Sequence, residues 1–235
     1  SPMRPEVKGY FLKEYGSWSV LIIAFLIGAG VSRAFSWALI PLFVALGLLI
    51  NSKQAFMKWL RKTSDRQALV IFLAQVALAT AILIVIFGGD IPRLLPLLII
   101  PAAYLVSNKL AGEHFLLTEL LGFALLSLAA VLAKFLLTNG LDVRLFVGVA
   151  LYFTAGVFKV KTLLLRKTQD RVLGVLYVLL SVYIYRRMHI PIIILLPLVD
   201  NLVVAARPYK VKLRTTGWIE VAKGLAFLSL FIYYY

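Results

Sequence analysis

Long apolar segments alternate with short polar ones along almost the whole chain. A helix needs roughly 20 apolar residues to cross a hydrocarbon core about 30 Å thick, and many of these segments approach that length. The pattern therefore predicts an all-α integral membrane protein with about nine transmembrane helices. We expect these helices at residues 17–32, 36–50, 67–87, 93–107, 115–137, 144–160, 172–186, 190–206 and 217–235.

Two of the expected helices contain two prolines each. The fourth contains Pro96 and Pro101, and the eighth contains Pro191 and Pro197. Broken helices persist at membrane depth where neighbouring protein or a polar cavity satisfies the freed backbone groups. A simple packing irregularity and a cavity wall both fit this pattern, since proline is common in membrane helices.

A seven-residue polar motif occurs twice, each time after an expected helix. Residues 60–66 read Leu-Arg-Lys-Thr-Ser-Asp-Arg and residues 165–171 read Leu-Arg-Lys-Thr-Gln-Asp-Arg, so only one position differs. We call both copies the basic motif. Self-similarity at a fixed offset indicates two copies of one helical unit. The charge bias of membrane loops is an alternative cause of the shared Arg and Lys, but it does not explain the shared Thr and Asp-Arg.

The offset between the basic motifs spans four expected helices. An even number of spans makes the repeats parallel, so both motifs would lie on one face of the membrane. We therefore expect a single membrane domain, residues 1–235, built from two four-helix repeats and a ninth helix. The repeats cover about residues 13–110 and 111–208, and the last helix covers about 217–235.

Composition and charge agree with a membrane protein. The chain is 62% hydrophobic, with a mean hydropathy of +0.95, whereas soluble domains are about 45–50% apolar. Its net charge of +15 follows the expected topology, which places the N-terminus in the cytoplasm and the C-terminus outside. A basic face for nucleic acid is therefore not expected. The absence of cysteine excludes disulfides, cysteine zinc ligands and a thiol nucleophile. Of the 25 Lys and Arg residues, the expected outer side holds only Arg33, Arg93, Arg144, Arg186 and Arg187.

Several charged residues lie inside the expected helices, where a charge at the helix centre costs about 2.5–3.5 kcal/mol on insertion scales. Glu119 and Asp200 are two of them, and pairing with an Arg or Lys of a basic motif is one interpretation. Glu220 and Lys223 are three residues apart, so a mutual pair on one helix face is the simplest interpretation.

The other interpretation gathers the polar residues in one cavity open to the cytoplasm. Arginine binds phosphate oxygens with a planar fork, and a cationic clamp can stabilise a departing diphosphate. As the base or the stabiliser of a cation we expect Glu14, Glu119 or Asp200. The expected phosphate ligands are Lys53, Arg61, Arg66, Lys159, Lys161, Arg166 and Arg171, and the further polar residues of the cavity are Lys13, Tyr15, Asn51 and Asn201.

The chain resembles the UbiA-type intramembrane prenyltransferases, which also have nine helices and polar motifs after the second and sixth. Asn51 stands where the first motif of that family opens, and Asp65-Arg66 and Asp170-Arg171 resemble the pair that closes each motif. Gly174 resembles the Gly that follows the second motif. The resemblance implies transfer from an isoprenoid diphosphate held by magnesium.

Most acidic residues of those motifs are replaced here. Asn51 is followed by Ser, Lys and Gln, and Lys159 and Lys161 stand where the second motif has acidic residues. A Mg²⁺ site needs several oxygen ligands, usually carboxylates together with substrate phosphates. Asp65 and Asp170 are therefore weak candidate Mg²⁺ ligands, and no other cofactor is expected.

A second resemblance is to the YwiC-like family of small bacterial and archaeal membrane proteins. Residues 13–18, Lys-Glu-Tyr-Gly-Ser-Trp, are similar to its Lys/Arg-Glu-His-Gly-Ala-Trp signature, with Tyr15 in place of the histidine. Residues 213–220 resemble its final Arg-x-x-Gly-x-x-Glu segment. This resemblance implies a multi-pass protein of the bacterial or archaeal inner membrane.

Three hypotheses of function remain. The first is a UbiA-like enzyme that binds an isoprenoid or lipid (di)phosphate in a basic cavity open to the cytoplasm, with prenyl transfer as a candidate reaction. The second is a non-enzymatic membrane subunit that recruits a partner or an anionic lipid. The third is a transporter of an anionic substrate, which the short and sparsely charged outer loops disfavour.

Overall fold

The computed structural model describes residues 15–61, 65–112, 115–165, 167–207 and 213–235, and these residues contain helices but no strand. The chain divides into two compact units. The first unit holds Ser1–Tyr15 and Phe35–Leu94, and the second holds Gly16–Ala34 and Leu95–Tyr235. This border does not coincide with the expected repeats, whose existence stays a prediction.

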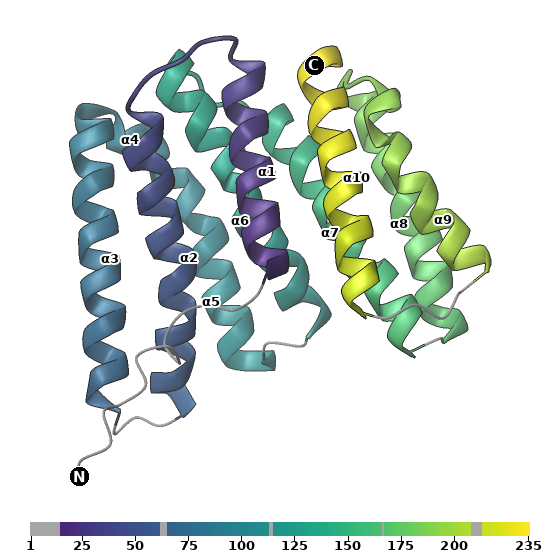
Figure 1. The fold of residues 1–235 in the computed structure, drawn as a ribbon, viewed down its shortest axis with the longest axis horizontal. Coiled ribbons are helices and arrows are strands. Elements are labelled where there is room, and N and C mark those ends of the chain that lie inside the picture. The colour runs from purple at the N-terminus through teal and green to yellow at the C-terminus, as the bar shows by residue number, and fades with distance from the viewer. Residues whose placement is uncertain (1–14, 62–64, 113–114, 166, 208–212) are drawn as a thin grey trace. The chain divides into compact units, whose positions relative to one another are not determined.

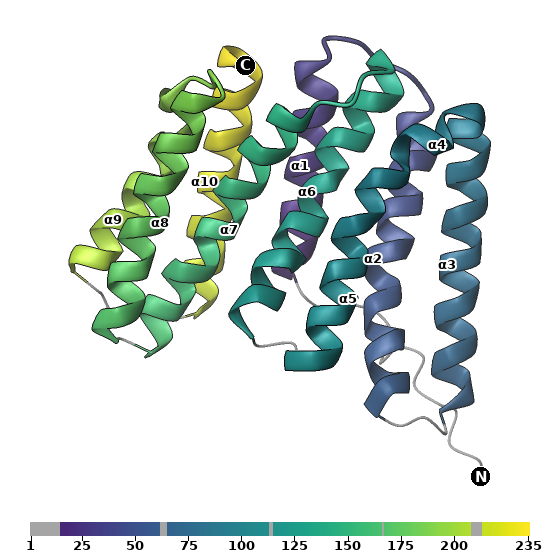
Figure 2. The same ribbon diagram turned by 180° about the vertical axis from the view of Figure 1, so that it is seen from behind.

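The first unit is built on a pair of neighbouring helices, α2 (Leu39–Arg61) and α3 (Arg66–Phe87), followed by η2 (Gly88–Asp90) and α4 (Ile91–Leu94). The two helices run in opposite directions side by side (Figures 1 and 2). Asp65 caps α3, because its carboxylate accepts a hydrogen bond of 3.0 Å from the Ala68 N–H. Gly88 ends α3 with a φ of +45°, a conformation that glycine adopts at little cost.

The second unit is a bundle in which helices consecutive in the chain pack on each other, α5 on α6, α6 on α7, α7 on α8 and α8 on α9. Its final helix packs on η4. The elements of this unit are α1 (Tyr15–Val31, from Gly16 on), η3 (Leu95–Leu98), α5 (Ile99–Ala111), α6 (Leu116–Thr138), α7 (Val143–Leu165), α8 (Thr168–Arg187), η4 (Ile192–Leu198), α9 (Val199–Ala206) and α10 (Leu213–Tyr234).

Glycine brings α1 close to two helices of the second unit. A Cβ atom at Gly28 would lie nearer than 3.0 Å to the Ala130 carbonyl oxygen of α6, and one at Gly30 would overlap Ile232 of α10. Small residues are the usual means of close helix packing in membranes. The position of α1 in its bundle therefore depends on these two glycines.

The expected interruptions of the two helices with two prolines each are present. Residues 88–98 consist of short 3₁₀ and α-helical turns before α5 begins at Ile99. Pro191 precedes the 3₁₀ helix η4 and Pro197 lies inside it, so a regular helix begins only at Val199. A proline lacks the N–H that an α-helix requires, which explains the change of helix type.

Five helical stretches are long and apolar enough to cross a membrane, and the protein is accordingly a multi-pass, all-helical membrane protein. They are Leu39–Trp59, Arg66–Ala111, Leu116–Thr138, Val143–Leu164 and Thr215–Tyr234, with Gly16–Val31 and Ile192–Ala206 as shorter apolar helices. Each of the nine expected segments falls on helical structure. The number of nine crossings stays a prediction, because α8 is not among these candidates and Arg66–Ala111 forms one stretch.

Several helices extend further than expected, and α2 and α7 do so the most at their C-terminal ends. The prediction ended the second helix at residue 50 and the sixth at residue 160, but α2 continues to Arg61 and α7 to Leu165. The added residues are mostly good helix formers such as Lys, Gln, Ala, Met, Leu and Arg, with no Gly or Pro. The polar residues before each basic motif consequently lie on a helix and not in a loop.

Candidate functional site

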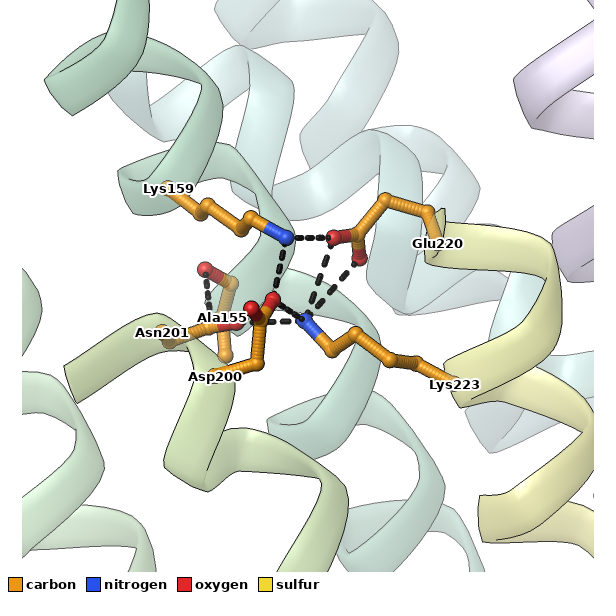
Figure 3. A network of polar contacts seen from close by, with 6 residues as sticks. All are labelled: Ala155, Lys159, Asp200, Asn201, Glu220 and Lys223. Atoms are coloured by element: carbon orange, nitrogen blue, oxygen red, sulfur yellow. Dashed lines mark hydrogen bonds and ion pairs between the residues drawn. The ribbon is translucent and has the colours of Figure 1, made fainter. Parts of the chain in front are cut away.

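Charged side chains from three helices of the second unit meet at one point (Figure 3). The Lys159 ammonium group of α7 donates hydrogen bonds to Asp200 of α9 and, over 2.5 Å, to Glu220 Oε1 of α10. The Lys223 ammonium group of α10 lies 3.1 Å from Asp200 Oδ2 and 3.1 Å from Glu220 Oε1. Each carboxylate is therefore shared by two ammonium groups, and the four charges sum to zero.

Asn201 completes this group, which we call the charge network: Lys159, Asp200, Asn201, Glu220 and Lys223. The Asn201 side chain accepts a hydrogen bond of 2.6 Å from Lys223 and donates one of 3.1 Å to the carbonyl oxygen of Ala155. Asn201 is buried, and buried polar groups need hydrogen-bond partners. Both the oxygen and the nitrogen of its side-chain amide have one. The amide thus fixes Lys223 against the backbone of α7.

Local sequence explains how each member reaches the network. Lys159 is placed by the extension of α7 beyond its apolar part. A regular α-helix begins after η4 and has Asp200 in its first turn, where the helix dipole favours a negative charge. Glu220 and Lys223 are three residues apart on α10, and this spacing puts them on one helix face.

The lysines and the carboxylates of the charge network differ in accessibility. The side chain of Lys159 is 0% exposed and that of Lys223 is 10% exposed, whereas Asp200 and Glu220 are 31% and 32% exposed. A molecule that approaches the network therefore meets carboxylate oxygens first. The two ammonium groups lie behind them and compensate their charge.

Next to the network, α6 and α7 are joined by an ion pair. Lys161 Nζ lies 2.9 Å from Glu119 Oε2. One residue before Glu119, the hydroxyl group of Thr118 lies 2.6 Å from that of Ser107 on α5, and both side chains are buried. Polar contacts thus connect α5, α6 and α7 inside an otherwise apolar bundle.

These contacts pair the acidic residues with lysines, but with lysines that lie outside the basic motifs. Glu119 and Asp200 both pair with a lysine that precedes the second basic motif, and Glu220 pairs with Lys223. The spacing along the sequence did not predict that Glu220 and Lys223 also contact charged residues of α7 and α9. The available signal was the presence of charged residues in each of these apolar helices.

The second basic motif contributes a structural contact. The Arg171 guanidinium group donates hydrogen bonds to the carbonyl oxygens of Ala205, over 2.5 Å, and Ala206, over 2.7 Å. Basic side chains near a helix end commonly satisfy the last carbonyl groups, and here α8 does so for α9. Asp170 lies in the first turn of α8, and its buried Oδ2 atom has no hydrogen-bond partner among the described residues.

The candidates of the first unit lie on or next to α2 and α3. Asn51 is buried on α2 and Lys53 is half-buried on the same helix. Arg66 is exposed at the start of α3, next to the cap Asp65.

Five of the candidate residues cannot be placed in this site. Lys13, Glu14 and Arg166 lie outside the described residues, and so do the side chains of Tyr15 and Arg61. The described candidates are divided between the two units. One cavity shared by all of them therefore stays a prediction.

The described residues do not form a donor set for magnesium. No group of three or more His, Asp or Glu side chains lies together within the part of the chain that the structure describes. Asp65 serves as a helix cap in the first unit, while Asp170 belongs to the second. Mg²⁺ normally takes near-octahedral oxygen coordination, so these two residues do not fit such an ion on their own.

The helices define a multi-pass membrane protein, and the charge network places ionisable residues within its apolar helices. Residues 12–134 match the family model described as YwiC-like protein, and this stretch is more than half of the chain. The protein belongs to the YwiC-like family. No curated protein and no solved structure matches the chain. The charge network lies beyond the matched stretch.

Proposed function

We propose that this protein is a UbiA-like membrane enzyme that acts on an isoprenoid or lipid (di)phosphate. In this proposal the charge network supplies the group that accepts a proton. The observation that carries the proposal is the convergence of two accessible carboxylates and two buried lysines from three apolar helices. Ionisable residues within membrane helices are costly, and they commonly mark functional sites.

The accessible carboxylates suit a prenyl transfer, because positive charge develops on the prenyl carbon in that reaction. In that reaction the C–O bond of the prenyl diphosphate breaks, and its electron pair leaves with the diphosphate. A nucleophilic acceptor forms the new bond to the prenyl carbon, and its proton passes to Asp200 or Glu220. A carboxylate close to the reacting carbon also stabilises the positive charge that develops there.

The lysines of the network compensate the charge of these carboxylates. Lys159 contacts both of them, and its ammonium group is shielded from any approaching substrate. Opposite charges this close compensate each other in an apolar surrounding. The diphosphate is expected to bind the basic side chains named from the sequence, and Arg66 is an exposed candidate among them.

The proposal includes the finer topology. We infer nine crossings, a cytoplasmic N-terminus, an outer C-terminus and a bacterial or archaeal inner membrane. The support consists of helical structure at all nine expected segments and of basic motifs that follow α2 and α7. A parallel repeat would place both motifs on the cytoplasmic face.

Ligand-dependent thermal unfolding in detergent tests the phosphate half of the proposal. The ligands are geranylgeranyl diphosphate, geranylgeraniol and inorganic diphosphate, each with and without Mg²⁺. A ligand present at a hundred times its dissociation constant stabilises the native state by about 2.7 kcal/mol.

We expect a shift with the prenyl diphosphate that Arg66→Ala abolishes. Arg187→Ala, which removes an exposed arginine outside the motifs, is the matched control and should keep the shift. No shift in any condition, or an equal shift with inorganic diphosphate alone, would overturn the proposal. A shift only with Mg²⁺ would support a metal-assisted form of it.

A further inference from the structure

A second candidate binding site lies in the C-terminal half of α10, away from the charge network in sequence. An open groove of about 570 Å³ is lined by Arg33, Leu228, Ser229, Ile232 and Tyr233. Arg33 follows the end of α1, and the other four residues belong to α10. The volume is within the range of about 300–1,000 Å³ that is typical of small-molecule sites.

The floor of the groove is formed where α1 and α10 touch. Gly30 leaves room for the Ile232 side chain, because a Cβ atom at Gly30 would overlap it. Arg33 lies in the turn after α1, with a φ of +49° and a hydrogen bond of 3.2 Å from its N–H to the Gly30 carbonyl oxygen. A non-glycine residue in this left-handed region is uncommon, so the turn holds a specific residue in an unusual conformation.

The groove is chemically polarised. Its walls include the apolar side chains of Leu228 and Ile232, whereas Arg33 is exposed at the helix end. Tyr233 is 76% exposed, and tyrosine is enriched where hydrocarbon meets water. None of the ion pairs among the described residues involves Arg33. A cation without an ion-pair partner next to an apolar groove is suited to bind an anion that carries a hydrocarbon chain.

We propose that this groove binds an anionic phospholipid. Its phosphodiester contacts the Arg33 guanidinium group, and one acyl chain lies along Leu228 and Ile232. Arginine suits a phosphodiester because its fork donates two parallel hydrogen bonds. A zwitterionic lipid is a poorer fit, since its own cation would lie close to Arg33. This proposal does not rest on the proposed enzymatic function, because it uses none of the residues of the charge network.

Lipid titration of the delipidated protein in detergent, read by native mass spectrometry and by thermal unfolding, tests this site. The probes are phosphatidylglycerol, phosphatidylcholine with the same acyl chains, glycerol phosphate and inorganic phosphate. We expect phosphatidylglycerol to bind most tightly and the two chain-free phosphates not to bind. Equal binding of both lipids, or saturable binding of either chain-free phosphate, would overturn the proposal.

Two variants separate the headgroup from the chain. Arg33→Gln removes the charge and should weaken phosphatidylglycerol binding about tenfold, which corresponds to one lost charge-assisted contact. Leu228→Trp fills the groove and should weaken binding while Arg33 is kept. Arg187→Gln, at an exposed arginine of α8, is the matched control. If every groove variant that folds bound phosphatidylglycerol with unchanged affinity, the proposed site would be contradicted.

Discussion

Lys159 Nζ lies 2.5 Å from Glu220 Oε1, although 61 positions separate the two residues in the chain. The contact joins α7 to the final helix, and Lys159 extends the connection to α9 through Asp200. One buried ammonium group thereby holds together three helices that contribute to the proposed active site. The network has a structural role in addition to any chemical one.

Replacement of Lys159 should strongly destabilise the protein. Lys159→Met leaves two carboxylates with only Lys223 to compensate them, and breaking a buried ion pair costs about 3–5 kcal/mol. Thermal unfolding in detergent measures the loss. Lys109→Met, at an exposed lysine of α5, is the control and should change little.

The double variant Lys159→Met/Asp200→Asn gives a sharper test of the same contact. Because it removes both charges of one pair, we expect it to be more stable than Lys159→Met alone. If the two substitutions were simply additive in their cost, Lys159 and Asp200 would not be coupled in the way described here.

Gly28 should not tolerate even a methyl group. In Gly28→Ala the new Cβ atom would collide with the backbone of Ala130, which cannot move aside as a flexible side chain can. Overpacking of this kind costs about 1–3 kcal/mol. Gly16→Ala on the same helix has no atom within 4 Å of the new Cβ and should be neutral or slightly stabilising. Equal unfolding temperatures of the two variants would contradict the close packing of α1 on α6.

Asp142, between α6 and α7, should make stability depend on pH. Burial alone would raise the pKa of Asp142, but hydrogen bonds from Lys134, the Leu145 N–H and the Tyr235 hydroxyl outweigh it and hold this pKa below its usual value. A lowered pKa stabilises the folded state above the unfolded pKa of about 3.9. That stabilisation is lost as the pH falls through the folded value.

The substitution Asp142→Asn should therefore lower the stability near neutral pH by about 1.5–3 kcal/mol, the range for hydrogen bonds to charged groups. The difference from the unsubstituted protein should shrink as the pH is lowered below about 4. Unfolding temperatures measured across this pH series provide the check. Asp90→Asn, in an exposed pair with Arg93, should show almost no effect at any pH. A pH-independent difference at Asp142 would argue for packing as its only role.

A substitution at Arg171 tests whether its guanidinium group has a structural role or is available to bind phosphate. Arg171→Met removes the donors to the Ala205 and Ala206 carbonyl groups, so the amides near the end of α9 should exchange their hydrogens faster. Hydrogen exchange of the ligand-free protein reads this effect directly. Unchanged exchange at α9 would mean that the guanidinium group is free to serve another purpose.

Hydrophobic patterning predicted most of the fold, since each expected segment is helical and the prolines interrupt the helices at 88–98 and before Val199. The ends of α2 and α7 were placed too early, because the prediction followed hydropathy while the helix continues through polar residues of high helix propensity. A border between apolar and polar residues therefore marks the end of the apolar part of a helix and not the end of the helix itself.

The candidate site was predictable only in part. The spacing of Glu220 and Lys223 predicts their contact, because it lies within one helix. The contacts of Lys159 with Asp200 and Glu220 depend on how three helices pack, which no local pattern specifies. Lysine near a basic motif was therefore expected to contact phosphate, whereas the structure surrounds Lys159 with carboxylates.

The measurement that tests the central claim most directly is the release of diphosphate from geranylgeranyl diphosphate by the protein in lipid nanodiscs that supply membrane-borne acceptors. The unsubstituted protein is compared with Asp200→Asn and Glu220→Gln, and binding is measured in parallel. We expect both variants to bind the diphosphate within a few-fold of normal, and at least one to release it roughly 100-fold more slowly, as loss of a general base predicts. Release at the normal rate by both variants, or no release by the unsubstituted protein, would contradict a catalytic role for the charge network.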